Sequence, residues 1–361
     1  MSAKKCRRED RPLVRRLSEN PLIKPEDVRP SEEELEVVCT FNPGVAQVDG
    51  ETLLLIRVAE RPVEEAGYVG VPVLDTGSDT PRIKVLRFKR EEVDTSDPRA
   101  VVHKGRKECY LSTISHLRVA RSKDGVHFEV DPEPAIRPTE PWEEYGVEDP
   151  RITRIDGTYY ITYVAVSRHG IATALATTKD FRSFEKHGII FPPANRDVAL
   201  FPEPIGGKFV TLHRPFPVYI GKPSMWLAYS PDLIHWDEHL FLMAPREGRW
   251  DSERIGGGTV PLKTEEGWLE IYHGVHPEKG YCLGAVLLDL ERPHKVIARS
   301  EEPILAPEED YETKGFFDRV VFTCGALLID GRRLRIYYGA ADRVVACAEA
   351  DLLELLDSLR N

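Results

Sequence analysis

A repeated motif is the feature that most constrains the fold of this 361-residue chain. The segments ARSKDGVHF (120–128), ATTKDFRSF (176–184) and AYSPDLIHW (228–236) share an alanine, then serine or threonine, then aspartate, then an aromatic residue. A fourth copy, AVLLDLERP (285–293), keeps the alanine and the aspartate. The copies begin 56, 52 and 57 residues apart. Self-similarity at such a period predicts stacked or radially repeated units.

A second series of segments lies out of phase with the first. ETLLLIRV begins at 51, GTYYITYV at 157, GKFVTLHR at 207, GWLEIYHG at 267 and RLRIYYGA at 333. Each segment follows a turn or a charged residue and is rich in β-branched, aromatic and leucine side chains, which is typical of strands. A strand-rich unit of about 50 residues therefore occurs five times.

Five such units without strong helical periodicity predict an all-β fold, a five-bladed β-propeller. The aspartate of each short motif is expected to bond backbone N–H groups in a hairpin turn, and its aromatic residue to pack between blades. A charged stretch around 89–108 is interpreted as an insertion in an early blade. We expect an N-terminal arm over 1–35, the propeller over 36–349 and a C-terminal helix over 350–361, where ADLLELLDSLR has a helical pattern.

Composition excludes several classes of protein. The formal net charge of −11 argues against general affinity for nucleic acid. No apolar run approaches the roughly 18 residues of a membrane span. The basic N-terminus has no apolar signal region, and the six cysteines are scattered, so a cytoplasmic protein with reduced thiols is expected. The histidines show no metal-binding spacing, so no metal is expected.

Polar residues stand at the ends of the predicted inner strands, where a propeller binds ligands. Each has an ordinary structural reading: arginines at strand ends form surface ion pairs, Asp-Pro is a turn, and a lone histidine belongs to the core. Their coincidence in all five repeats instead indicates a cationic pocket floored by carboxylates. The residues are Asn42, Arg57, Arg61, Glu148, Asp149, Arg151, Asn195, Arg196, Asp197, His213, Arg214, Lys263, Tyr272, His273 and Asp342.

A pocket of this kind suits a sugar together with an anion. Arginine forks match phosphate oxygens, and carboxylates bind sugar hydroxyls and supply protons. Hydrolysis of a glycoside with inversion requires one carboxylic acid and a second carboxylate that activates water. When phosphate itself attacks, the second carboxylate is unnecessary, and one acid with a cationic cradle is sufficient.

The ordered motifs FNPG, RVAERP, GVEDPRIT, FPPANRDVALFPE, LHRP, GGGTVPLKTEEGWLEIYHG and RIYYGAAD resemble glycoside hydrolase family 130. That family comprises five-bladed propellers that are β-mannoside phosphorylases, and some β-mannosidases. The resemblance implies that Asp149 is the general acid, which passes its proton through a mannose hydroxyl, and that Glu148 is structural. It places the mannose on Asn42, Arg57, Arg61 and Asp342, and phosphate on Arg196, Arg214, Lys263 and His273. Val260 stands where family members often have proline, which leaves the reach of Lys263 open.

The expected reaction is inverting phosphorolysis of β-mannosides, with β-1,2-linked mannobiose or mannooligosaccharides favoured, releasing α-D-mannose 1-phosphate. The expected partners are a β-mannooligosaccharide and inorganic phosphate as co-substrate, without another cofactor. Alternatives are a β-mannosidase that uses water, a non-catalytic carbohydrate-binding or scaffold propeller, and a furanosidase-type hydrolase, for which no third carboxylate is evident. A homo-oligomer built through the arm and the C-terminal helix is also left open.

Overall fold

The protein is almost entirely built of β-strands. A computed structural model describes residues 12–77, 80–217 and 219–360. Over these residues it has twenty-six strands, and its α-helices are the short α1 (Asp310–Thr313) and α2 (Leu352–Arg360). Single 3-10 turns occur at Pro25–Asp27, Arg90–Glu92 and Pro141–Glu143. The predicted all-β class and the C-terminal helix are confirmed, while the division into five blades stays a prediction.

The first half of the chain forms an eight-stranded sheet in the order β14-β13-β12-β11-β9-β3-β2, with β10 added to β9. The backbones of its two halves pair through a parallel bridge between Gly146 and Ser115, whereas the other pairings are antiparallel. The strands are β2 (Leu35–Val48), β3 (Glu51–Pro62), β9 (Ile114–Ser122), β10 (Glu129–Val130), β11 (Gly146–Ile155), β12 (Thr158–Ser167), β13 (Gly170–Thr178) and β14 (Glu185–Phe191).

Three further antiparallel sheets follow along the chain. One contains β15 (Asn195–Leu200), β16 (Phe209–Pro215), β17 (Met225–Ser230) and β18 (Asp237–Met243). The next contains β19 (Arg254–Gly257), β20 (Leu262–Lys263), β21 (Trp268–His276), β22 (Gly280–Leu288) and β23 (Val296–Arg299). The last contains β24 (Val321–Ile329), β25 (Arg333–Ala340), β26 (Val344–Asp351) and β1 (Val14–Arg16).

The N-terminal segment is part of the last sheet. Val14 pairs with Ala350 and Arg16 with Ala348, so β1 extends the sheet that the C-terminal strand β26 would otherwise end. Arg16 also donates to Glu312 at 2.8 Å. The predicted arm therefore joins both ends of the chain in one sheet, although its first eleven residues lie outside the described ones.

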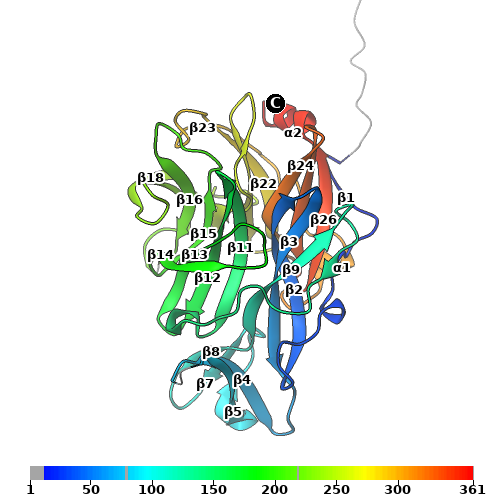
Figure 1. The fold of residues 1–361 in the computed structure, drawn as a ribbon, viewed down its shortest axis with the longest axis vertical. Coiled ribbons are helices and arrows are strands. Elements are labelled where there is room, and N and C mark those ends of the chain that lie inside the picture. Colours follow the sequence, from blue (N-terminus) through cyan, green and yellow to red (C-terminus); the bar gives the residue numbers. More distant parts are fainter. Residues whose placement is uncertain (1–11, 78–79, 218, 361) are drawn as a thin grey trace, which may run out of the picture.

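An insertion between β3 and β9 extends the molecule on one side (Figure 1). It contains β4 (Tyr68–Asp75), β5 (Arg82–Lys89), β6 (Val93–Asp94), β7 (Ala100–His103) and β8 (Cys109–Leu111), and so begins earlier than the predicted 89–108. Its apolar residues, among them Val71, Val101 and Tyr110, pack on Val164 and Val166 of β12. The insertion is thereby fixed against the large sheet.

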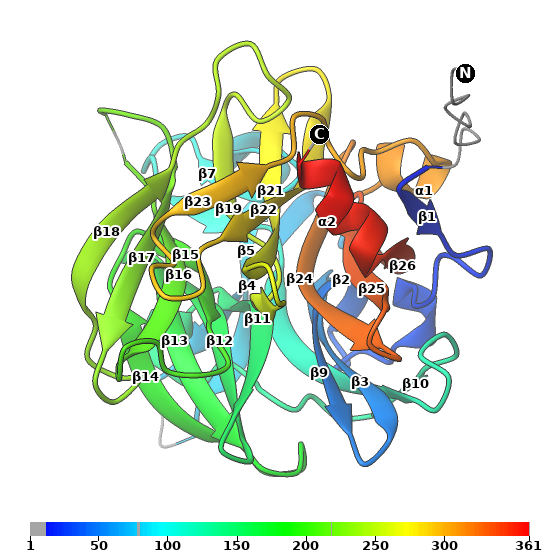
Figure 2. The same cartoon turned by 90° about the horizontal axis from the view of Figure 1, so that it is seen from above.

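Helix α2 covers the opposite end of the molecule (Figures 1 and 2). Leu355, Leu356 and Leu359 of α2 are buried in a core cluster that includes Leu269 and Leu287. No helix in the described part of the chain is long and apolar enough to cross a bilayer.

The repeated motif forms the predicted turns. The Asp124 Oδ1 atom accepts backbone N–H bonds from Val126 and His127 at 2.8 and 2.9 Å, and Asp180 and Asp232 accept the equivalent bonds. The aromatic residue that ends each motif packs in the core; Phe128, for example, contacts Tyr337 edge-on with 5.9 Å between ring centroids. The structural role predicted for these aspartates is confirmed.

Candidate active site

A cavity of about 450 Å³ collects most of the residues that the sequence singled out. Its walls come from neighbouring strands of successive sheets, among them β2 and β3, β15 and β16, and β19 and β21, and from the loops that carry Arg99 and Phe317. The predicted residues that line it are Asn42, Arg57, Glu148, Asp149, Asn195, Arg196, Asp197, Arg214, His273 and Asp342. Arg61 and Lys263 do not line it.

Three of these side chains are directed by the same backbone feature. Asn42, Asp149 and Asp197 have φ angles of 48°, 49° and 57°, in the left-handed region that Asn and Asp tolerate better than most residues. Each lies within a register shift, between Phe41 and Gly44, Glu148 and Arg151, or Arg196 and Ala199. Such bulges re-aim a side chain away from the regular strand pattern. The Asp-Pro sequence is therefore both a backbone irregularity and a site feature.

Asp149 is held by two donors on neighbouring strands. Asn42 Nδ2 donates to its Oδ1 atom at 2.9 Å, and Arg57 Nη1 donates to the same atom at 3.2 Å. Arg57 also donates to Glu148 at 2.7 Å and to Ser115 at 3.0 Å. Both bonds to Asp149 end on Oδ1, and neither of these two donors contacts Oδ2.

Burial controls the charge of the neighbouring carboxyl groups. Burial raises the pKa of Glu148, with Arg57 opposing the shift. Burial likewise raises the pKa of Asp342 to about 7, against the stabilising charge of Arg57. Asp342 is consequently protonated in part near neutral pH, when it can donate a hydrogen bond as well as accept one.

The other side of the cavity is cationic. Arg196, Arg214 and Arg254 line it from β15, β16 and β19. Among the described residues, no carboxylate lies within ion-pair distance of Arg196 or Arg254. Arg254 Nη1 donates to the Tyr281 hydroxyl at 3.2 Å, which fixes the guanidinium without neutralising it. Two unneutralised arginines at one wall make a site for an anion.

His273 adds a neutral donor or acceptor to this wall. It is fully buried, and its ring lies 4.6 Å from that of Phe322. Burial lowers the pKa of His273 to about 3, although Asp197 opposes the shift, so the imidazole is uncharged at neutral pH. Neither ring nitrogen has a hydrogen-bond partner within the described structure, and Nε2 lies 3.5 Å from the Asp197 carboxylate.

Asp197 connects the cationic wall to the strand that carries Asp149. Burial alone would raise its pKa, but the guanidinium groups of Arg214 and Arg151 hold it at about 2. Its carboxylate lies 2.6 Å from Arg214 Nε and accepts from Arg151 Nη2 at 3.2 Å. Arg151 also donates to the Asp149 carbonyl at 3.3 Å and to the Gly257 carbonyl at 2.7 Å. One buried network thus fixes both the Asp149 backbone on β11 and the Arg214 side chain.

The glycines after Arg254 are required by this crowding. A Cβ atom at Gly256 would lie 2.3 Å from Asp197 Oδ2 and 2.6 Å from a ring carbon of His273. No larger residue fits there without displacing the network. The Gly-Gly-Gly segment is therefore part of the site through its backbone.

The structure corrects the prediction for Lys263. Its side chain is exposed, its ammonium group pairs with Glu203, and it lines a different cavity. Lys263 on β20 pairs with Trp268, five residues along β21 from His273, which is about 17 Å at the rise of a strand. The lysine therefore lies at the wrong end of the strand to meet an anion beside His273.

Arg61 is also displaced from the predicted sugar site. It lies four residues beyond Arg57 on β3, or about 13 Å, and its Nε atom donates to Glu36 at 2.6 Å. Both partners are more than two-fifths exposed, so this is an ordinary surface ion pair. Arg57 and Arg61 lie on the same face of β3, so the sequence pattern did not distinguish them, but only Arg57 reaches the cavity.

A match to a family model accompanies this geometry. The model of glycoside hydrolase family 130, described as beta-1,4-mannooligosaccharide phosphorylase, matches residues 79–361. The chain belongs to glycoside hydrolase family 130. The predicted resemblance is thereby confirmed.

Individual members of family 130 are similar over most of the chain. A beta-1,2-mannobiose phosphorylase of Listeria innocua is 46% identical, covering 96% of this chain and 98% of that protein. A 1,2-beta-oligomannan phosphorylase of a Thermoanaerobacter species is 42% identical, covering 69% of this chain and 81% of that protein. The solved structure of the Listeria innocua enzyme in complex with beta-1,2-mannobiose has a TM-score of 0.90 and covers 96% of this chain and 99% of that one.

Sequence reasoning missed Arg254 in this family 130 chain. Arg254 begins β19 just as Asn195 begins β15, and both line the cavity, as does Asp149 near the start of β11. The repeat could have revealed Arg254, because it stands at the start of a strand, just before the glycine segment that the sequence had already singled out. The rim residues Arg99 and Phe317 were also missed, since they belong to loops with no repeat signal.

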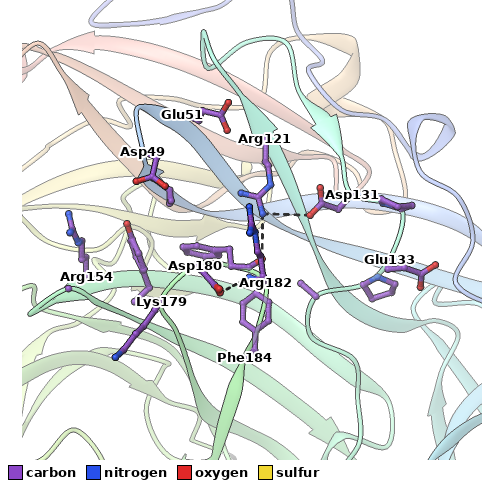
Figure 3. A pocket seen from close by; sticks show the side chains of 17 residues that line it. Asp49, Glu51, Arg121, Asp131, Glu133, Arg154, Lys179, Asp180, Arg182 and Phe184 are labelled. Carbon is purple, nitrogen blue, oxygen red and sulfur yellow. Dashed lines mark hydrogen bonds and ion pairs between the residues drawn. The ribbon is translucent and has the colours of Figure 1, made fainter.

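A larger cavity, of about 810 Å³, lies elsewhere and lacks these features (Figure 3). It is lined by turns at the far ends of the strands, such as Asp49, Gly157 and Asp180. Its charges are mixed: Arg121 faces Asp131 at 3.8 Å, and the Asp180 carboxylate caps its own turn. With none of the predicted site residues in its walls, it is a groove between turns rather than the candidate active site.

Proposed function

We propose that the protein catalyses inverting phosphorolysis of β-mannosides and releases α-D-mannose 1-phosphate. The observation that carries this proposal is the pairing of one positioned acid with unneutralised arginines in the same cavity. Asp149 has a free carboxylate oxygen, while Arg196 and Arg254 have no carboxylate partner among the described residues. A site for a nucleophilic anion needs this inventory, and a site for water does not.

Asp149 is the general acid of the proposed reaction. Asn42 and Arg57 hold Oδ1, so the proton resides on Oδ2 and passes to the leaving oxygen, directly or through a hydroxyl of the mannose. Asn42, Arg57 and Asp342 surround the mannose ring, and Asp342 can donate to a hydroxyl because burial keeps part of its population protonated. These groups orient the sugar for attack from the cationic side.

Phosphate occupies the cationic wall. Arg196, Arg214 and Arg254 supply planar donors from three strands, and neutral His273 adds one hydrogen bond. The attacking oxygen forms the bond to the anomeric carbon as the glycosidic bond breaks, and the proton of Asp149 ends on the leaving sugar. No carboxylate base is required because the attacking phosphate is already an anion.

The similar proteins support a β-1,2 linkage. The two phosphorylases of Listeria innocua and Thermoanaerobacter described above are named for β-1,2-linked mannose, although the family model is described by a β-1,4 activity. We therefore propose β-1,2-mannobiose or a β-1,2-mannooligosaccharide as the substrate.

Hydrolysis by water is the second candidate, and a specific observation favours it. Burial raises the pKa of both Asp342 and Glu148, and a carboxylate with a raised pKa is a better base for activating water. Glu148, however, already forms an ion pair with Arg57 at 2.7 Å. Hydrolysis would also leave the arginines of the cationic wall without a role in the reaction.

The two reactions are separated by their dependence on phosphate. The purified protein is incubated with β-1,2-mannobiose and with β-1,4-mannobiose, each with and without inorganic phosphate, and the products are identified. If the enzyme is a phosphorylase, mannose 1-phosphate will form only when phosphate is present. It should form faster from β-1,2-mannobiose than from β-1,4-mannobiose. Free mannose formed equally well in phosphate-free buffer would reject the proposal.

The remaining predictions concern the architecture and the setting of the enzyme. We propose that the sheets act as five blades, with the eight-stranded sheet counting as two, because the backbones of its halves pair through the single Gly146–Ser115 bridge. The domain boundaries at 35 and 349, a cytoplasmic location, a requirement for no metal or organic cofactor and assembly as a homo-oligomer are kept as proposals.

A further inference from the structure

The inserted segment reaches across the rim of the cavity. Its strands β6, β7 and β8 pack on the large sheet, where the Tyr110 ring lies 6.4 Å from that of Tyr145. Yet Arg99, just before β7, lies over the ring of Phe317, which precedes β24 in the last sheet. The guanidinium carbon is 4.3 Å from the ring centroid, and both residues line the cavity. The segment therefore bridges two sheets above the site.

Both ends of this bridge are fixed. Arg99 donates from Nε and Nη2 to the Asp97 carboxylate at 3.0 and 2.8 Å, and those hydrogen bonds lower the pKa of Asp97 to about 2. Ser112 donates its backbone N–H to the Arg99 carbonyl at 3.0 Å. On the other side, the Phe317 N–H donates to the Ala341 carbonyl at 3.1 Å, next to Asp342. The bridge is held in place before any ligand binds.

Arg99 retains a donor that the protein does not use. Its Nε and Nη2 groups are bonded to Asp97, whereas Nη1 has no hydrogen-bond partner in the described part of the chain. A guanidinium that is fixed on an aromatic ring and keeps one free N–H₂ group is suited to a sugar hydroxyl.

The transferred sugar and the leaving sugar are expected to bind at different depths of the cavity. The side chains of Asp149 and Arg214 are 8% and 5% exposed, so the reacting mannose and phosphate belong at the floor. The Arg99 side chain is 48% exposed, at the rim. A substrate whose terminal mannose reaches Asp149 must place its next sugar beneath the bridge.

We propose that Arg99 determines specificity for the leaving sugar: it binds the reducing-end sugar of a disaccharide, and its bridge to Phe317 obstructs longer leaving groups. This inference rests on the proposed phosphorolysis. Asp97 acts as a positioning residue, because its carboxylate accepts hydrogen bonds from two nitrogens of Arg99. The modest cavity volume of about 450 Å³ agrees with a short substrate.

The test compares β-1,2-mannobiose with β-1,2-mannotriose at saturating phosphate. Arg99→Ala is expected to lower kcat/KM for mannobiose about tenfold, as befits the loss of one charge-assisted hydrogen bond. The same variant is expected to lower kcat/KM for mannotriose much less, so that the preference for mannobiose falls about fivefold. Asp97→Asn is expected to shift the preference in the same direction by a smaller factor, and the KM for phosphate is expected to stay within twofold.

Arg106→Ala is the matched control, since Arg106 belongs to the same insertion, is 63% exposed and does not line the cavity. An unchanged preference in Arg99→Ala, or a rise in the KM for phosphate without a change for mannobiose, would overturn the inference. Thermal unfolding checks that Arg99→Ala is folded, and Phe317→Leu, which removes the other half of the bridge, must shift the preference in the same direction.

Isothermal titration calorimetry measures mannobiose binding in phosphate-free buffer, where no phosphorolysis can occur, and so tests this inference separately from the proposed function. Failure of the wild-type protein to form mannose 1-phosphate would refute the proposed function alone. Weaker mannobiose binding by Arg99→Ala than by Arg106→Ala would still support the sugar contact, and equal binding by the two variants would refute it.

Discussion

Replacing Arg254 by alanine tests the cationic wall most sharply, because Lys263 provides a matched comparison. Arg254 keeps two nitrogens available beyond the bond from Nη1 to Tyr281, so it can make one or two charge-assisted bonds to phosphate. Such bonds contribute roughly 1.5–3 kcal/mol each. A loss of about 2 kcal/mol corresponds to a rise of about 30-fold in the KM for phosphate.

The assay is phosphorolysis of saturating β-1,2-mannobiose with phosphate varied, read out as mannose 1-phosphate. Lys263→Ala is expected to leave the KM for phosphate within twofold, since the Lys263 ammonium pairs with Glu203 away from the cavity. Arg254→Lys, which keeps the charge but loses the planar fork, is expected to fall between the wild-type enzyme and Arg254→Ala. Equal effects of Arg254→Ala and Lys263→Ala would refute the assignment.

Three further variants test other parts of the site. Asp149→Asn is expected to lower kcat by roughly 10² to 10⁴ with little change in thermal stability, because the amide oxygen still accepts from Asn42 and Arg57; near-normal turnover would contradict its role as the acid. Asp197→Asn leaves Arg151 and Arg214 without their shared carboxylate, so denaturant unfolding should show a loss of about 3–5 kcal/mol, and an unchanged midpoint would count against the network. For Asp342, whose pKa rises from 3.8 to about 7 on folding, the wild-type protein should lose stability as pH increases from about 4 to 7, by at most about 4 kcal/mol. Asp342→Asn should lack this pH-dependent loss, and parallel stability curves for the two proteins would show that the carboxyl does not titrate as inferred.

Local features of the sequence predicted much of the fold. The motif aspartates bind backbone N–H groups within three residues of themselves, so a nine-residue pattern contains everything that the turn requires. The same is true of Asp149 before Pro150, where the residue types favour an irregular backbone at one position. For this reason the irregular backbone at Asp149 could be predicted from local residue types, whereas its role as the acid was implied by the family resemblance and stays a prediction.

The prediction that Lys263 binds phosphate was wrong because the position of this residue depends on strand pairing, which no local sequence pattern contains. Lys263 and Arg254 flank the same glycine segment, and their distance from His273 is decided by the pairing of β19 and β20 with opposite ends of β21. Register between strands is a non-local property, and a difference of a few residues moves a side chain by more than 10 Å. The bridge from Arg99 to Phe317 joins residues more than 200 positions apart, and its contact had no sequence signal.

The central claim is that an anion held by the arginines attacks the sugar while Asp149 protonates the leaving group. Phosphorus-31 NMR of the purified enzyme with β-1,2-mannobiose and inorganic phosphate tests it directly, since the signal of the product reports both bond formation and the anomeric configuration. The account predicts that phosphate is consumed in equal amount to the α-mannose 1-phosphate formed, and that Asp149→Asn abolishes the new signal. A β-anomer, or release of free mannose while the phosphate signal stays constant, would contradict it.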